Sequence, residues 1–322
     1  MGGIVAHGVS LDKGRAPTKT PPMHDDHLDA LPTEQGLPES EALDLLPTEE
    51  LLRTMNAQDR RAVDAVGEAI PSVGVVVDAV ARCLKDGGRF HGFGAGTSGR
   101  LVLLDAVECV PTFGVDPDLY QGHLAGGAEA FIHAKEGVED DRAAGRAAAR
   151  EAGVGKGDYV LAVSASGRAP WCLGVLEAAL AVGARRGALV CNPSSPLADA
   201  ADDVILAETG PEVLAGSTRL KAGTAQKMVL NMISTAVMVR LGRTFGHWMV
   251  GVRPTNAKLR RRAERLIARL AERTDGVGEA LDLAEGDVRL AVLMLKKGCS
   301  VGEARRQLDA AHGSLRRALD LS

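Results

Sequence analysis

A glycine-rich segment from Gly94 to Arg100 (GAGTSGR) has the composition of an anion-binding loop. It follows a short apolar run and precedes a helical pattern, so its backbone N–H groups lie at a helix N-terminus, where the helix dipole favours negative charge. The adjacent hydroxyls of Thr97 and Ser98, with Gly96 allowing close backbone approach, suit a phosphate monoester. The GxGxxG spacing alone leaves two alternatives open, a dinucleotide cofactor and a tight turn without a ligand.

A second small-residue loop repeats this design after another apolar run. It runs from Ser164 to Gly167 (SASG), and Ser164 and Ser166 carry its hydroxyls. Two hydroxyl-bearing loops at one edge of a sheet could hold one phosphorylated sugar from two sides. The pair therefore predicts a phosphosugar site more strongly than either loop does alone.

A third candidate lies at the start of a long helical pattern, where Ser217, Thr218 and Lys221 occur close together. The hydroxyls could contact a sugar phosphate, and the lysine could neutralise its charge. Plain helix capping explains Ser217 and Thr218 equally well, and a solvated surface charge explains Lys221. The sequence leaves these interpretations open.

Two carboxylates are candidates for proton transfer. Glu108 follows the first loop on the same predicted helix and has apolar neighbours, so we expect it to be partly buried, as a group that exchanges protons near neutral pH would need. The alternative is a surface glutamate at a helix end. Glu139 lies in an acidic run with Glu136, Asp140 and Asp141, which also fits a helix start that favours the dipole. Spacing alone does not select Glu139 from this run.

Strands that alternate with helices are expected to position these groups, which predicts an α/β fold with a parallel sheet covered on both faces. Such sheets bind ligands at the carboxyl ends of their strands, where both loops fall. The predicted strands span residues 89–93, 119–124, 158–163, 187–191 and 204–207. The predicted helices between them span residues 100–109, 140–152 and 170–182.

Helical patterns flank this alternating region. Three helices are predicted between residues 40 and 85, with one boundary at Pro71, and a long helix is predicted over 221–241. A further helix at 256–273 is followed by a linker at 275–286 and then by three short helices. The predicted organisation is a disordered tail (1–32), a phosphosugar-binding domain with N-terminal helices (33–275) and a small C-terminal three-helix unit (276–322).

Composition excludes several classes of protein. The 322 residues carry 38 Lys and Arg against 42 Asp and Glu, so the chain lacks the basic field of a nucleic-acid or membrane-surface binder. No apolar run reaches the length of a membrane span, and the N-terminus does not read as a signal peptide. The five cysteines form no CxxC pair, which favours reduced thiols, a cytoplasmic location and no zinc site.

The motifs together resemble those of the bacterial N-acetylmuramic acid 6-phosphate etherase family, from residue 33 almost to the end of the chain. The matching runs are GAGTSGR at 94–100, ECVPTFG at 108–114, AGG at 125–127, SGR at 166–168, CNP at 191–193, GPE at 210–212, GSTRLKAGTAQK at 216–227 and TNAKL at 255–259. Four positions depart from the family pattern: Leu37, Val110, Ala169 and Pro254. Of these, Ala169 removes one hydroxyl contact that the second loop would otherwise offer.

This resemblance implies a fold and a reaction. The fold would be the sugar isomerase domain, a three-layer, flavodoxin-like parallel sheet. The reaction would cleave the D-lactyl ether of N-acetylmuramic acid 6-phosphate to N-acetylglucosamine 6-phosphate and D-lactate, without a metal or another cofactor. By motif position Glu108 would be the proton donor and acceptor, and Glu139 the second acid or base.

The resemblance also implies how the substrate is held. Its phosphate and hydroxyls would contact the three small-residue segments, and the protein would be a homodimer in which one subunit lies near the other's site. The predicted substrate-binding residues are Gly96, Thr97, Ser98, Ser164, Ser166, Gly167, Ser217, Thr218 and Lys221. Two other functions stay open as alternatives: a non-catalytic phosphosugar-sensing regulator on the same fold, and a nicotinamide-dependent oxidoreductase.

Overall fold

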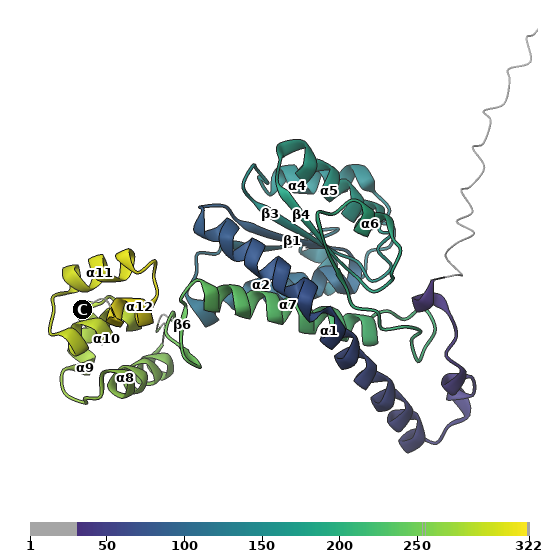
Figure 1. The fold of residues 1–322 in the computed structure, drawn as a ribbon. Helices are drawn as coiled ribbons and strands as arrows, with labels where there is room; N and C mark the ends of the chain where they lie inside the picture. The colour runs from purple at the N-terminus through teal and green to yellow at the C-terminus, as the bar shows by residue number, and fades with distance from the viewer. Residues whose placement is uncertain (1–30, 253, 255, 321–322) are drawn as a thin grey trace, which may run out of the picture.

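A five-stranded parallel sheet forms the centre of the protein in a computed structural model that describes residues 31–252, 254 and 256–320. Its strand order is β2-β1-β3-β4-β5, and Figure 1 shows the sheet with its flanking helices. The strands are β1 (Phe90–Gly94), β2 (Tyr120–Leu124), β3 (Tyr159–Val163), β4 (Arg185–Val190) and β5 (Asp203–Leu206). The predicted α/β class and all five predicted strands are confirmed. Gly94 of β1 pairs with Val163 of β3, so the loops that follow these two strands start side by side.

Helices cover both faces of this sheet, as expected for a parallel sheet. One layer consists of α1 (Thr48–Lys85), α2 (Gly96–Phe113) and α7 (Lys221–Arg240), and the other of α4 (Arg142–Glu151) and α5 (Pro170–Val182). Two short helices, α3 (Glu129–Ile132) and α6 (Pro196–Asp199), lie in the connections. Phe90 packs in the first layer and Phe93 in the second, so β1 contributes to both halves of the core.

The N-terminal region differs from its prediction. In place of three helices, α1 continues through Pro71 as one helix, because its buried face extends on both sides of the proline, from Ala62 to Leu84. Packing against α7 and the sheet stabilises the helix where local propensity alone predicts a break. Three single-turn 3-10 helices precede it: Pro32–Glu34, Pro38–Ser40 and Leu43–Leu45. The predicted disordered tail lies outside the described residues as far as residue 30.

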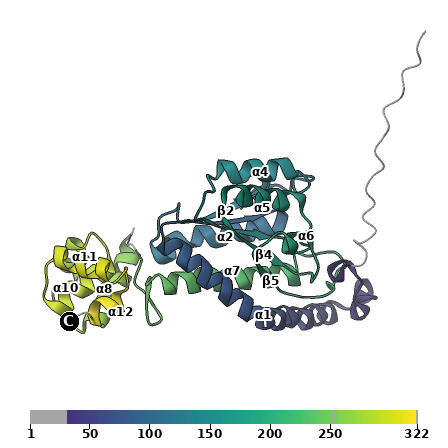
Figure 2. The ribbon, with the colours of Figure 1, turned by 45° about the horizontal axis from the view of Figure 1, so that its top comes forward.

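The C-terminal helices gather into a bundle beside the sheet, after a small hairpin of β6 (Thr244–Phe245) and β7 (Trp248–Met249). Figure 2 shows this bundle at the far end of α7. Its helices are α8 (Ala257–Ala271), α9 (Val277–Leu283), α10 (Val288–Lys297), α11 (Val301–Ala310) and α12 (Leu315–Asp320). The predicted linker at 275–286 is therefore wrong, since it contains α9. Because α8 shares a core with the later helices, we place the start of the bundle at α8.

Candidate active site

The first loop joins β1 to α2 in a very close turn. A Cβ atom on Gly99 would lie 2.2 Å from the carbonyl oxygen of Gly94, so both positions need glycine. Gly96 starts the helix with a φ of 54°, in the left-handed region that favours glycine. No side chain caps the N-terminus of α2, and its first turn carries no acidic residue. Its first backbone amides are therefore available to an anion.

The two hydroxyls of this loop lie against α7. The Ser98 hydroxyl donates a hydrogen bond to Oε1 of Gln226 over 2.8 Å, and both side chains are buried. The Thr97 methyl group lies 3.5 Å from the position that a Cβ on Gly223 would occupy. The start of α7 therefore forms one wall of the first loop. Gln226 lies in the run that carries the family resemblance, but nothing in its local sequence indicated a partner in the first loop.

The second loop follows β3 and is held by its own hydroxyls. Ser164 Oγ accepts a hydrogen bond from the Gly167 amide at 3.1 Å, and Ser166 Oγ accepts one from the Arg168 amide at 3.2 Å. The two hydroxyls also lie 3.4 Å apart, so one can donate to the other and at least one proton is left for a ligand. Gly167 has a φ of 69°, and a Cβ there would lie 2.3 Å from the Ser195 hydroxyl, so a larger residue would not fit.

Packing brings the second loop to the third predicted segment. Ala165 of the loop forms a small buried cluster with Cys191, at the end of β4, and Ala222 of α7. Asn192 adds a hydrogen bond to the Ala165 carbonyl at 3.1 Å. All three predicted binding segments therefore meet around the N-terminal turns of α7.

The N-terminus of α7 is closed by a carboxylate that the sequence analysis did not single out. Glu212 is fully buried and accepts hydrogen bonds from the backbone amides of Lys221, at 3.0 Å, and Ala222, at 2.9 Å. Burial raises the pKa of Glu212, and these two hydrogen bonds oppose that shift. The alternative in which Ser217 or Thr218 caps the helix is wrong, because Glu212 takes that role. An acid between apolar neighbours was the only local signal.

Lys221 is not a surface charge. Its side chain is buried, and its ammonium group donates a hydrogen bond over 2.7 Å to Gln58 of α1. Burial lowers the pKa of Lys221, while the nearby Glu212 carboxylate opposes that change. The sequence predicted a substrate contact for Lys221, whereas the structure gives its ammonium group a protein partner. We therefore regard Lys221 as a residue that stabilises the structure around the site and does not contact the ligand.

Glu139 lies beside the second loop. Its backbone carbonyl accepts a hydrogen bond from the Trp171 amide, in the first turn of α5, at 2.8 Å. Burial raises the pKa of Cys172 to about 12, and the negative charge of Glu139 adds to that shift. Asp141, not Glu139, caps α4. The Glu139 side chain is exposed, and it does not cap α4.

Glu108 lies in the C-terminal half of α2, away from the first loop. It is exposed, so the expectation of partial burial is wrong within one chain. At a rise of ~1.5 Å per residue it lies about 18 Å along α2 from Gly96, farther than a sugar monophosphate extends. Within one chain, the backbone of Glu108 is therefore far from a phosphate held at the N-terminus of its own α2.

One turn before Glu108, Asp105 joins α2 to α7. The Ser234 hydroxyl donates a hydrogen bond to Asp105 Oδ1 at 3.0 Å. Burial raises the pKa of Asp105 to about 6, and the Ser234 hydrogen bond opposes the shift. The phenol of Tyr120 lies next to this carboxylate, and its own pKa is raised by burial and by the charge of Asp105.

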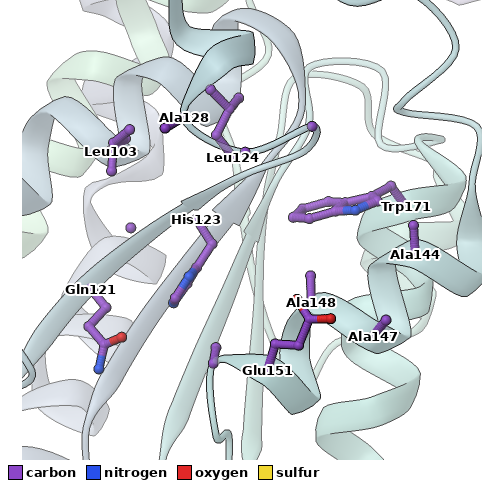
Figure 3. Close-up of a pocket in the computed structure, with 14 residues that line it drawn as sticks. Leu103, Gln121, His123, Leu124, Ala128, Ala144, Ala147, Ala148, Glu151 and Trp171 are labelled. Atoms are coloured by element: carbon purple, nitrogen blue, oxygen red, sulfur yellow. The ribbon is translucent and has the colours of Figure 1, made fainter.

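A separate cavity of about 710 Å³ lies between β2 and helices α4 and α5, and none of the predicted site residues lines it. Figure 3 shows His123 and Trp171 on opposite sides of this space. Nε2 of His123 lies 3.2 Å from Nδ1 of His91, a buried ring whose other nitrogen is 3.5 Å from Asp158. Burial lowers the pKa of His123 to about 4, and the neighbouring His91 adds to this shift.

The nicotinamide alternative loses its expected support. A dinucleotide site needs an acidic residue at the end of the second strand, where it binds the ribose. In this protein β2 ends at Leu124 and continues into Ala125, while Asp116 and Asp118 precede the strand. The hydroxyl-rich loops instead match a ligand with a terminal phosphate.

The fold and the loops define a protein of the SIS-domain class. A model of the SIS domain matches residues 142–236, and a model of the glucokinase regulatory protein N-terminal SIS domain matches residues 73–180. A phosphoheptose isomerase structure from Francisella tularensis aligns with a TM-score of 0.41 and 17% identity, covering 58% of this chain and 97% of that one. That likeness is too distant to indicate a substrate.

Much nearer relatives identify the family. An N-acetylmuramic acid 6-phosphate etherase from Geobacillus thermodenitrificans is 46% identical over 294 residues, which cover 91% of this chain and 100% of the relative. Another, from Rubrobacter xylanophilus, is 47% identical over 92% of this chain and 98% of the relative. The relative from Mycolicibacterium smegmatis is 45% identical over 91% of this chain and 98% of its own length. The chain belongs to the N-acetylmuramic acid 6-phosphate etherase family.

Proposed function

We propose that this protein is an enzyme that cleaves the D-lactyl ether of N-acetylmuramic acid 6-phosphate to N-acetylglucosamine 6-phosphate and D-lactate. Membership of the family supports the reaction. The single structural observation that carries the proposal is the convergence of three small-residue segments around the first turns of α7, next to the uncapped N-terminus of α2. Glu139 lies at the start of α5, the helix that follows the second loop.

The phosphate is proposed to bind at the first two loops. The amides at the start of α2 and the hydroxyls of Thr97, Ser164 and Ser166 would surround it, since these groups offer protons to an anion at a positive helix end. Gly96 and Gly167 would allow the backbone to approach closely. Ser217 and Thr218, beyond the closed end of α7, are proposed to contact sugar hydroxyls. Holding the remote phosphate orients the reacting carbons.

The chemistry proposed for the carboxylates is elimination followed by hydration. In the open-chain sugar, the C1 carbonyl acidifies the hydrogen on C2. A carboxylate removes that proton, lactate leaves from C3 with the ether oxygen, and an unsaturated aldehyde remains. A carboxylate then helps water to add at C3, and C2 regains a proton. Glu139 and Glu108 are proposed as these two proton-transferring groups, because each step moves only a proton and a leaving group.

We propose that the working unit is a homodimer in which Glu108 serves the partner's site. Glu108 is too far from its own first loop, yet it lies on an exposed and partly apolar surface of α2. Leu104 on this surface is 48% exposed and Val107 is 58% exposed. A second copy that covers the surface would bury these side chains and bring Glu108 to the other subunit's sugar.

Mixed dimers test this arrangement. Each of the variants Glu108→Gln and Glu139→Gln should be inactive alone. If Glu108 acts across the interface, a dimer of one chain of each kind contains one intact site, so random mixing should restore about a quarter of wild-type activity. If both carboxylates act within one chain, mixing restores nothing. Size-exclusion chromatography with light scattering would confirm that both variants still form dimers.

Labelled water tests the reaction. Incubating the enzyme with N-acetylmuramic acid 6-phosphate in H₂¹⁸O should place the label on C3 of the amino sugar and leave the lactate hydroxyl unlabelled. Label in that hydroxyl would refute elimination, because direct attack on the lactyl carbon gives this pattern. Binding of the phosphosugar without any lactate release would instead favour the non-catalytic regulator.

Among the described residues, none of the helices has the length and apolar character that a bilayer crossing requires. A cytoplasmic location stays a prediction from the sequence. So does the absence of a nucleic-acid or membrane partner.

A further inference from the structure

A buried amide lies directly behind the hydroxyl of Ser98. Gln226 is only 1% exposed, and its Oε1 accepts the Ser98 hydrogen bond at 2.8 Å. Its Nε2 atom is also buried and has no hydrogen-bond partner among the described residues. A buried amide nitrogen without an acceptor is uncommon in native proteins, so this arrangement carries a cost that a second arrangement of the pair could offset.

The hydrogen-bond direction at Ser98 differs from that in the second loop. Ser164 and Ser166 accept from backbone amides, and their hydroxyls lie 3.4 Å apart, so one can donate to the other and at least one proton is left for a ligand. A serine hydroxyl has one proton, and Ser98 uses it on Gln226, which leaves only lone pairs towards the loop. In this state Ser98 repels a phosphate oxygen.

A half-turn of the Gln226 side-chain amide would reverse the direction of its hydrogen bond with Ser98. Nε2 would then donate to Ser98 Oγ, and the serine proton would be free to point at a phosphate oxygen. The turn exchanges an unpartnered amide nitrogen for an unpartnered carbonyl oxygen, so the number of unpartnered buried atoms of Gln226 stays the same. The new hydrogen bond to phosphate is charge-assisted and stronger than the one lost.

We propose that Gln226 is a positioning residue that switches Ser98 from an inward donor to a phosphate donor when a phosphorylated sugar binds. The inference rests on the proposed function, in which the first loop holds the phosphate. It adds a specificity device, because a sugar without phosphate offers no acceptor strong enough to turn the amide.

Two substitutions separate this role from a structural one. In Gln226→Glu the carboxylate can only accept, so it holds the Ser98 proton permanently. In Gln226→Met the side chain keeps its bulk but leaves the proton free. By isothermal titration at pH 8 with N-acetylglucosamine 6-phosphate, we expect Gln226→Glu to weaken binding by about tenfold or more, while Gln226→Met stays within about threefold of wild type. A purely structural role predicts comparable losses in both.

A double-mutant cycle removes the remaining ambiguity, which is simple repulsion between the new carboxylate and the phosphate. If Gln226 acts through Ser98, the effect of Gln226→Glu should largely vanish in a Ser98→Ala background, whereas repulsion would persist there. Lowering the pH should also restore the affinity of Gln226→Glu relative to wild type, since a protonated glutamate can donate to Ser98.

The outcomes distinguish the two proposals. If the wild-type protein does not bind the phosphosugar, the proposed function fails. If Ser98→Ala binds the phosphosugar as wild type does, the switch fails, while the phosphate role of the α2 amides and Thr97 stands. If Ser98→Ala weakens binding but Gln226→Glu does not, or if Gln226→Met is as poor as Gln226→Glu, the switch alone is overturned. Thermal unfolding of each variant checks that the fold is retained.

Discussion

The N-termini of α2 and α7 lie side by side and follow similar small-residue segments, but they differ in whether a carboxylate of the protein is bonded to them. The end of α2 has no side-chain cap and no acid in its first turn. The end of α7 is occupied by the buried carboxylate of Glu212, which accepts two backbone hydrogen bonds. One helix end is therefore satisfied from within the protein, and the other is where we propose that the phosphate binds. The comparison indicates that a helix N-terminus becomes an anion site only where the fold supplies no anion of its own.

The largest expected effect is on the unfolding free energy, and it compares a glycine at the start of α2 with a glycine at the start of α7. In Gly99→Ala the new Cβ would lie 2.2 Å from a backbone oxygen that cannot move aside, so we expect a loss of about 4 kcal/mol or more in unfolding free energy. In Gly223→Ala the nearest atom, the Thr218 oxygen, is 3.4 Å away. That variant should gain about 0.5 kcal/mol from helix propensity. Urea unfolding measures both, and equal effects would contradict the tight turn at α2.

The next largest effect on the unfolding free energy is expected when the carboxylate at the N-terminus of α7 is removed. Glu212→Ala leaves two buried amides without acceptors, so we expect a loss of about 3 kcal/mol in urea unfolding. Glu212→Gln keeps one acceptor oxygen and serves as the control, with a smaller loss. The opened helix end should also bind anions, so sulfate should raise the melting temperature of Glu212→Ala more than that of wild type. An equal response to sulfate would show that the two ends do not differ as we describe.

Asp105, which links α2 to α7 through its hydrogen bond with Ser234, should make the unfolding free energy depend on pH. Because burial raises the pKa of Asp105 to about 6, the folded state favours the protonated form. The unfolding free energy should therefore fall as the pH rises from the unfolded pKa towards 6. Asp105→Asn keeps the acceptor for Ser234 without the charge, so above pH 7 it should be more stable than wild type by about 2 kcal/mol. The difference should disappear below pH 4, and a difference independent of pH would contradict this origin.

The smallest expected effect on stability comes from making α2 resemble α7. Thr97→Asp places a carboxylate in the first turn of α2, which should stabilise the helix by about 0.3–1 kcal/mol. The same charge would compete with the phosphate, so the KM for N-acetylmuramic acid 6-phosphate should rise while the melting temperature rises slightly. Thr97→Asn, without the charge, is the control. An unchanged KM in Thr97→Asp would place the phosphate elsewhere.

Local pattern was enough to predict most of the sheet. The five strands and the helices between them occur within a few residues of their predicted positions, because buried runs and glycine turns are short-range signals. Two predictions were wrong because long-range packing overrides the local pattern. Pro71 does not end a helix, since the buried face of α1 packs on both sides of it, and the predicted linker at 275–286 forms α9 in the core of the bundle.

The site shows the same division. Spacing selected Ser98 and Ser166 as candidates, and the family resemblance selected Glu139 from its acidic run. The structure brings the two serine-bearing loops together through α7. Glu212 and Gln226 were missed, because their roles exist only through contacts with α7 and with a hydroxyl 128 residues away. No local pattern carries that information.

The sequence by itself determined the chemistry on offer: hydroxyls and glycines at strand ends, and glutamates within helices and turns. Only the tertiary structure decided which helix end stays open to an anion, and that Glu139 lies at the loops of its own chain while Glu108 does not. The physical reason is that residue type and spacing set what a group can do within a turn or two of the backbone. Burial, direction of hydrogen bonding and distance across the fold depend on residues that the chain brings together only when it packs.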